Sequence, residues 1–178
     1  LFRGGTVVSG RGTRRADILV EGEKILEVGR NITRKADQII DVTGMLLMPG
    51  FIDAHCHLGL FGDALGFEAD DGNESTDPCT PQLRAVDGVN PLDRGFREAR
   101  EGGVTTVLTG PGSANPIGGW WTAMKTLGFR VDDMVMVPEI GMKFALGENP
   151  KRVYNGKGVT PMTRMATASV IREALLAA

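Results

Sequence analysis

One segment, residues 44–57, constrains the fold of this chain most, because it joins an apolar run to a pair of histidines. Its last part, residues 51–57, has the length and composition of a buried strand. Side chains two positions apart on a strand point to the same side, so His55 and His57 project together while Cys56 points away. Both histidines of the chain lie here. Two imidazoles at one strand end are suited to a single metal ion, which makes His55 and His57 candidate metal ligands, with ordinary core or surface histidines as the alternative.

Composition excludes several classes of protein. With a net charge of −2 and 24% charged residues, the chain has no basic footprint for nucleic acid. No apolar run approaches the ~20 residues that span a bilayer, and no secretory signal opens the sequence. The two cysteines, Cys56 and Cys79, are too few for a disulfide framework. We therefore expect a cytoplasmic protein with free thiols and with neither nucleic acid nor membrane as a partner.

Residues 1–48 are predicted to form a small β domain. The predicted strands have β-branched and apolar residues, and two of them flank a Glu-Gly-Glu turn typical of a hairpin. They span residues 6–8, 16–20, 24–28 and 38–42. A few short strands bury little area, so this sheet needs a partner to cover its apolar face.

From residue 49 onward the pattern changes to strands that alternate with helices, which indicates βα units and a parallel sheet. The predicted strands span residues 51–57, 104–108, 120–127 and 142–146. The predicted helices span residues 92–101, 131–137 and 160–177. A long polar stretch, residues 59–89, is predicted to be a loop, as is the Gly-rich stretch 110–119. Residues 120–127 fit either a strand or a helix, and we favour the strand.

The segment at residues 44–57 resembles the first barrel strand of the metal-dependent amidohydrolase superfamily, which follows the pattern P-G-hydrophobic-hydrophobic-D-x-H-x-H. Residues 110–119 and 143–152 resemble its imidazolonepropionase-related branch. The resemblance covers essentially the whole chain, whereas family members are at least about twice as long. It implies the N-terminal half of a (β/α)8 TIM barrel, residues 49–178, preceded by a small β-sandwich-like domain, residues 1–48. A complete small α/β domain is the competing interpretation.

The resemblance also implies a divalent metal, zinc or else manganese or iron, with one or two ions in the full-length protein. A metal-bound hydroxide would attack the substrate. In many amidohydrolases a carboxylated lysine on strand four bridges two metals. Lys143 and Lys125 both lie in apolar, strand-like contexts, and we favour Lys143 over Lys125, while an ordinary solvated lysine remains the alternative for each. Asp53 either orients one imidazole by accepting a hydrogen bond from it or caps a nearby loop.

Residues in the predicted loops are candidates for substrate binding. Asn115 lies in the loop after strand two and Glu148 and Arg152 follow strand four, so all three would face the active-site side of a barrel. For Asn115 a rigid turn is the favoured alternative, and for Glu148 and Arg152 the sequence does not separate substrate binding from holding the loop. Trp120 and Trp121 would line a pocket or, as we favour, serve buried packing.

The resulting functional hypothesis is a metal-dependent hydrolase of C–N bonds in its full-length form. Candidate substrates are small molecules: a cyclic amide, a dipeptide or an N-acyl amino acid. The two further histidines and the catalytic Asp that such a site needs are expected beyond this chain, so the chain would carry half a site and be inactive alone. We also expect the rest of its own barrel as a partner and a homo-oligomer. The alternative function is a non-catalytic, amidohydrolase-like scaffold.

Overall fold

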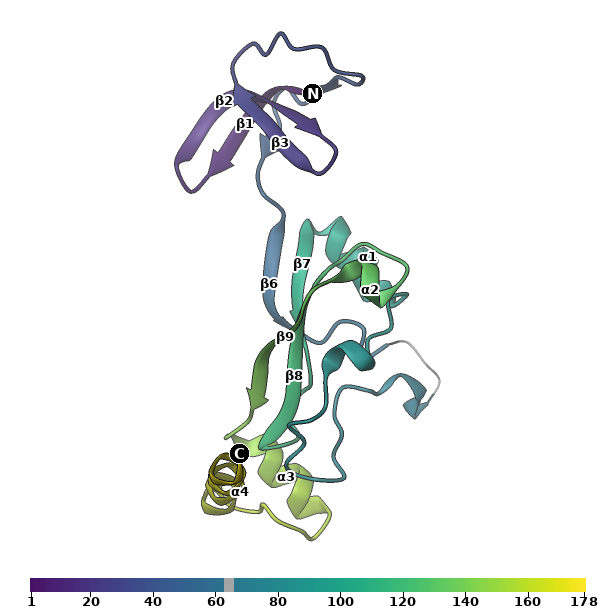
Figure 1. Ribbon diagram of the computed structural model, residues 1–178, viewed down its shortest axis with the longest axis vertical. Helices are drawn as coiled ribbons and strands as arrows, with labels where there is room; N and C mark the ends of the chain where they lie inside the picture. Colours follow the sequence, from purple (N-terminus) through teal and green to yellow (C-terminus); the bar gives the residue numbers. More distant parts are fainter. Residues whose placement is uncertain (63–65) are drawn as a thin grey trace. The chain divides into compact units, whose positions relative to one another are not determined.

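The computed structural model describes residues 1–62 and 66–178 and divides the chain into two compact units, Leu1–Pro49 and Gly50–Ala178 (Figure 1). Residues 63–65, which belong to the predicted loop at 59–89, lie outside the described residues. The two units are described separately below.

The first unit is one mixed sheet of five strands, in the order β3-β2-β1-β4, with β5 also paired to β1. The strands are β1 (Phe2–Ser9), β2 (Gly12–Glu21), β3 (Lys24–Gly29), β4 (Ile40–Asp41) and β5 (Leu46–Leu47). The predicted hairpin between β2 and β3 is confirmed, because the two strands pair antiparallel up to Glu21 and Lys24. The second layer that a β-sandwich would need is absent from the described residues of this unit.

One buried carboxylate links the first unit together. Asp17 on β2 accepts hydrogen bonds from the backbone N–H of Gly4 (2.9 Å) and of Ile32 (3.1 Å). These bonds, led by that from Gly4, lower the pKa of Asp17 below its ordinary value. A small apolar cluster formed by Leu1, Leu19 and Ile32 completes this core.

The second unit is built on a four-stranded sheet in the order β6-β7-β8-β9. The strands are β6 (Phe51–Cys56), β7 (Val104–Thr109), β8 (Ile117–Lys125) and β9 (Val135–Phe144). The strand favoured at residues 120–127 is therefore confirmed, because most of that segment lies in β8. The expected all-parallel arrangement was wrong: β6 and β7 run parallel, but β8 is antiparallel to both β7 and β9. The connections 110–116 and 126–134 are too short for the crossover that parallel neighbours require.

The helices differ in detail from the prediction. They are α1 (Arg94–Glu101), α2 (Val131–Met134), α3 (Glu148–Gly156) and α4 (Arg164–Ala177), with 3-10 turns η1 (Phe67–Ala69) and η2 (Ala85–Asp87). The expected helix at 131–137 ends after one turn, because residues 135–137 begin β9, an edge strand that tolerates Pro138. Helix α3 was not predicted. No helix in the described part of the chain is long and apolar enough to cross a bilayer.

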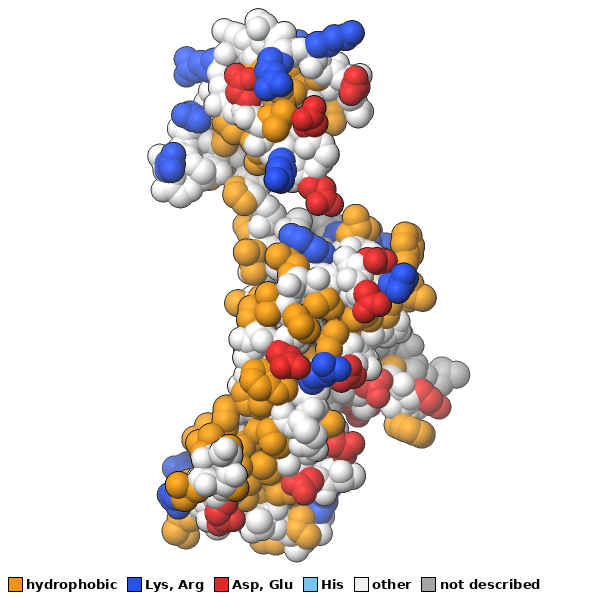
Figure 2. All heavy atoms as spheres, in the orientation of Figure 1, with side chains coloured by type: hydrophobic (Ala, Val, Ile, Leu, Met, Phe, Trp, Pro, Cys, Tyr) orange, Lys and Arg blue, Asp and Glu red, His pale blue; other side chains and the backbone are white. Residues whose placement is uncertain are grey.

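The core of the second unit lies on one face of the sheet. Phe96 from α1 and Met134 from α2 pack with Val107 and Met124 from the strands, and all four are almost fully buried. Strand β6 was expected to be buried, but Ile52 is 66% exposed. The reason is that β6 is an edge strand of the sheet and its outer face is left uncovered by the described residues. Figure 2 shows apolar side chains, in orange, exposed over this unit.

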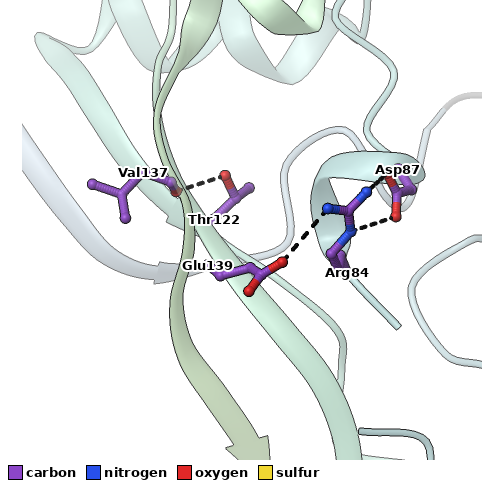
Figure 3. A network of polar contacts seen from close by, with 5 residues as sticks. All are labelled: Arg84, Asp87, Thr122, Val137 and Glu139. Atoms are coloured by element: carbon purple, nitrogen blue, oxygen red, sulfur yellow. Dashed lines mark hydrogen bonds and ion pairs between the residues drawn. The ribbon is translucent and has the colours of Figure 1, made fainter. Parts of the chain in front are cut away.

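The segment before α1 continues the sheet where β7 ends. The backbone carbonyl of Leu83 accepts the N–H of Trp120 at 2.8 Å, and a Cβ at Gly119 would lie 2.6 Å from that oxygen, so only glycine fits there. Arg84 then joins η2 to β9, since its guanidinium contacts Asp87 at 2.8 Å and Glu139 at 3.5 Å (Figure 3). In the same view, the Thr122 hydroxyl donates to the carbonyl of Val137 at 3.0 Å, which ties β8 to β9.

Candidate metal centre

Strand directions bring the predicted metal ligands to one edge of the sheet. Strands β6, β7 and β9 run the same way, while β8 runs in the opposite direction. The carboxyl ends of β6, β7 and β9 therefore meet, and they carry His55 and His57, Gly110 and Lys143 respectively. Lys143 lies on β9, which is the fourth strand of this sheet in chain order, as its assignment assumed. Because β8 runs in the opposite direction, β9 is only the third strand that shares the direction of β6.

The two imidazoles lie close together. Their ring centroids are 5.7 Å apart at an interplanar angle of 86°. The Nδ1 atom of His57 is 2.7 Å from the carbonyl oxygen of Gly110. A carbonyl only accepts hydrogen bonds, so this contact assigns the proton to Nδ1 and leaves the Nε2 lone pair of His57 free for a metal.

The indole of Trp121 is the hub around which these groups gather. Its ring centroid lies 4.5 Å from that of His55 and 5.7 Å from that of His57, and the Nζ of Lys143 lies 5.4 Å away. Trp121, His55 and Lys143, together with residues of β7 and β9, line an open hollow of about 400 Å³. Trp121 is buried, as expected, with 7% of its surface exposed. It also lines the candidate site, which was the alternative considered for it.

The electrostatic environment at this edge favours the uncharged forms of the His55 imidazole and the Lys143 amine. Burial lowers the pKa of Lys143. The pKa of His55 is also lowered, first by desolvation and then by repulsion from Lys143 and His57. A neutral imidazole is the form that binds metal, so these shifts suit His55 to the predicted role. Lys125, the alternative lysine, lies at the opposite end of β8, where its Nζ is 3.4 Å from the Thr106 hydroxyl.

Two neighbours of the histidines serve the backbone instead. The carboxylate of Asp53 accepts the backbone N–H of His55 at 3.0 Å. The thiol of Cys56 turns to the other face and donates to the carbonyl of Leu108 at 3.5 Å. Burial raises the pKa of Cys56, so this residue remains a thiol at neutral pH.

The structure does not bring the three predicted substrate-binding residues together with the histidines. Asn115 is buried, and its amide nitrogen donates to the carbonyl of Glu74 (2.6 Å) and to the Thr80 hydroxyl (2.9 Å). Its amide oxygen accepts the Tyr154 hydroxyl at 2.6 Å. Burial raises the pKa of Tyr154 to about 12, so the phenol keeps the proton that it donates. Asn115 therefore locks its loop, which was the alternative considered for it.

Glu148 and Arg152 both lie on α3 and pair locally. The carboxylate of Glu148 contacts Lys151 at 2.8 Å and Arg164 of α4 at 3.7 Å, and the first of these contacts chiefly lowers the pKa of Glu148. The guanidinium of Arg152 donates to the side-chain oxygen of Asn149 at 3.2 Å. Both pairings stabilise the helix and its junction with α4.

The residues present fit part of a metal site. His57 has its second nitrogen held by a backbone carbonyl, which is the usual arrangement of a metal-binding histidine. A catalytic zinc site needs about three protein ligands. No cluster of three or more His, Cys, Asp or Glu side chains occurs within residues 1–62 and 66–178. The described residues thus offer two imidazoles and one lysine, which is an incomplete ligand set.

Sequence reasoning did not identify Gly110, and for Trp121 it favoured buried packing over lining a pocket. A Cβ on Gly110 would lie 2.2 Å from the Trp121 ring, so the indole requires glycine at that position. The available signal was the alternation of β8, which places Trp121 on the face opposite to Trp120. This alternation alone did not show that Trp121 faces the histidines, because the directions of the neighbouring strands were not known.

Comparison with known proteins finds relatives named amidohydrolase and deaminase. The chain is 37% identical over 174 residues to the amidohydrolase tasK of Hapsidospora irregularis, which covers 89% of this chain and 18% of that protein. It is 52% identical over 59 residues to a 5-methylthioadenosine/S-adenosylhomocysteine deaminase of Pyrococcus abyssi, covering 32% of this chain and 14% of the relative. No family model matches the chain.

Among solved structures, an amidohydrolase from Thermotoga maritima MSB8 superposes with a TM-score of 0.93 at 45% identity. The match covers 98% of this chain and 46% of that one. The chain therefore spans less than half the length of the relatives it matches. These similarities support the amidohydrolase superfamily for this chain, and none of the three relatives bears the name of an imidazolonepropionase.

Proposed function

We propose that this chain is the N-terminal part of a metal-dependent amidohydrolase that hydrolyses C–N bonds in small molecules. The observation that carries the proposal is the gathering of His55, His57 and Lys143 around Trp121 at one edge of the sheet. The relatives named amidohydrolase, deaminase and D-hydantoinase support it, since each of these names describes hydrolysis of a C–N bond. Within that class we keep the imidazolonepropionase-related branch as the finer proposal.

The histidines would hold a divalent ion, with zinc as the first choice because imidazole nitrogen suits it. Such an ion would polarise the scissile carbonyl and lower the pKa of a water molecule. His57 would bind through Nε2, because Gly110 holds Nδ1. Lys143 would contribute as a carbamate anion: the lowered pKa leaves more of its Nζ as the neutral amine, which would add to CO₂ and release one proton.

The rest of the site would come from residues outside this chain. Two imidazoles and one lysine leave coordination positions open, and in the proposed barrel these would be filled from later strands. The three strands that share one direction, β6, β7 and β9, would be the first part of that barrel. The uncovered face of the sheet would then pack against the barrel's remaining strands.

The substrate class that best fits is a small amide, and a cyclic amide, a dipeptide and an N-acyl amino acid are the three candidates. The hollow beside His55 and Lys143 does not distinguish these three, because its other side chains are apolar, Leu108, Trp121 and Met142 among them. Groups that recognise the substrate's polar ends would therefore lie outside this hollow.

The test is metal analysis of the full-length protein, followed by hydrolysis assays on the three candidate substrate classes. We expect one or two equivalents of metal and turnover of at least one class, both lost in the His55→Ala/His57→Ala double variant. A full-length protein that binds no divalent metal and hydrolyses none of the three would contradict the proposal and favour the non-catalytic scaffold.

A further inference from the structure

We propose that Trp121 is the positioning residue of this metal centre: its indole sets the orientation of both imidazoles and the place of the Lys143 side chain. The inference rests on the proposed function, because it concerns the same three ligands. It goes beyond that function by assigning the arrangement of the ligands to a residue that itself binds no metal.

The first support is that one ring contacts all three groups. The indole makes edge-on contacts with His55, at 71°, and with His57, at 67°. The Nζ of Lys143 lies over the same ring, 5.4 Å from its centroid. Within residues 1–62 and 66–178, neither the imidazole of His55 nor the Nζ of Lys143 makes a hydrogen bond, so the indole is a fixed neighbour that the two share.

The second support is that the backbone is shaped around the indole. A Cβ on Gly110 would lie 2.2–2.4 Å from three ring atoms of Trp121, which shows how closely β7's end approaches the ring. The carbonyl of the same Gly110 accepts the hydrogen bond from His57. The His57 ring is thereby held on one side by this carbonyl and on another by the indole.

The third support comes from the indole nitrogen. Within the described residues, Trp121 Nε1 is the one buried side-chain nitrogen or oxygen without a hydrogen-bond partner. An unpaired buried donor is costly, so a phenylalanine would be favoured if this position required only apolar packing. The ring of tryptophan offers the largest contact surface of any side chain, and all three neighbours lie against it.

The neighbouring tryptophan provides a matched control. Trp120 is the next residue on β8, so its side chain projects to the opposite face of the sheet, away from the histidines. Its backbone N–H binds Leu83, and this bond survives substitution of the side chain. Replacing Trp120 therefore perturbs the same strand without touching the ligands.

The test uses the full-length protein and four forms: wild type, Trp121→Leu, Trp121→Phe and Trp120→Leu. Zinc affinity is measured by competition with a chelator, and ligand geometry by the visible absorption of the cobalt-substituted protein. Circular dichroism checks that each variant is folded. We expect Trp121→Leu to weaken zinc binding by about 10–100-fold, as loss of an orienting residue does, and to change the cobalt spectrum. Trp121→Phe should show a smaller loss and a changed spectrum, and Trp120→Leu should match wild type.

The outcomes separate this inference from the proposed function. If wild type binds metal and both Trp121 variants keep its affinity and cobalt spectrum, the inference is overturned while the proposed function stands. If Trp121→Leu does not fold, Trp121→Phe decides by the same two readouts. If Trp120→Leu weakens binding as much as Trp121→Leu, the effect belongs to the strand and the inference is overturned. A wild type without metal overturns both.

Discussion

Substitution of Gly110 by alanine tests how tightly the candidate metal centre is packed. The new methyl group would lie 2.2 Å from Cγ, 2.3 Å from Cδ1 and 2.4 Å from Cδ2 of Trp121. Carbon atoms prefer a separation of about 3.5–4.0 Å, so the indole or the backbone must move by roughly 1 Å. The ring is confined by His55, with 4.5 Å between ring centroids, so the shift displaces a predicted metal ligand as well. Overpacking of this kind costs about 1–3 kcal/mol.

The matched control for this substitution is Gly141→Ala. Gly141 pairs with Trp121 across the sheet, yet a Cβ there would meet no atom within 4 Å. Its alanine should leave the free energy of unfolding unchanged or raise it by less than about 1 kcal/mol, because alanine restricts the unfolded chain.

The assay is urea denaturation of the two full-length variants beside wild type, together with zinc affinity. At a slope of about 2 kcal/mol per molar urea, the middle of the usual range, the Gly110→Ala midpoint should fall by about 0.5–1.5 M. Zinc binding should weaken in the same variant. A Gly110→Ala protein that matches both wild type and Gly141→Ala in stability and zinc affinity would refute the reasoning, because the close contact with the indole would then be without consequence.

Three further predictions concern other parts of the chain. In the full-length enzyme Lys143→Ala should lose the second metal ion and lower kcat by orders of magnitude. Lys125→Ala should keep two bound metal ions and the wild-type kcat, and the reverse result would make Lys125 the bridge. Asn115→Ala should lower the free energy of unfolding by about 1–3 kcal/mol, since it strands the buried Tyr154 hydroxyl, and an unchanged denaturation midpoint would contradict the locking role. Asp17 has a lowered folded-state pKa, so its contribution to stability is present above the unfolded value near ~3.9 and is lost as pH falls through the folded pKa. Asp17→Asn should therefore flatten the acid limb of a pH–stability curve, and a curve that keeps the wild-type slope would refute this.

Local patterns were sufficient to predict most strands. The turn chemistry between β2 and β3 and the apolar runs of β6 and β7 are encoded within a few residues, and the structure confirms them. Strand direction depends on distant pairing, which explains the error at β8: its composition fits a strand of either direction. Burial of β6 was overestimated because apolar residues at positions 51 and 52 do not reveal whether the described chain contains the surface that covers them.

The candidate site was predictable only where its chemistry is carried by adjacent residues. The His-x-His spacing predicted that His55 and His57 would project together, and their rings do lie near each other. A rigid turn was the favoured alternative for Asn115, but the residue that holds its amide could not be predicted, because Tyr154 lies 39 positions away. Trp121 was underestimated for the same reason: its role depends on Gly110 and Lys143, which come from other strands.

The central claim is that His55 and His57 bind the same metal ion, and a crystal structure of the full-length, zinc-loaded protein tests it most directly. We expect one zinc ion about 2.0–2.1 Å from a ring nitrogen of each histidine. For His57 that nitrogen should be Nε2, with Nδ1 still bonded to the carbonyl of Gly110. A zinc ion bound elsewhere, or either imidazole turned away from it, would contradict the account.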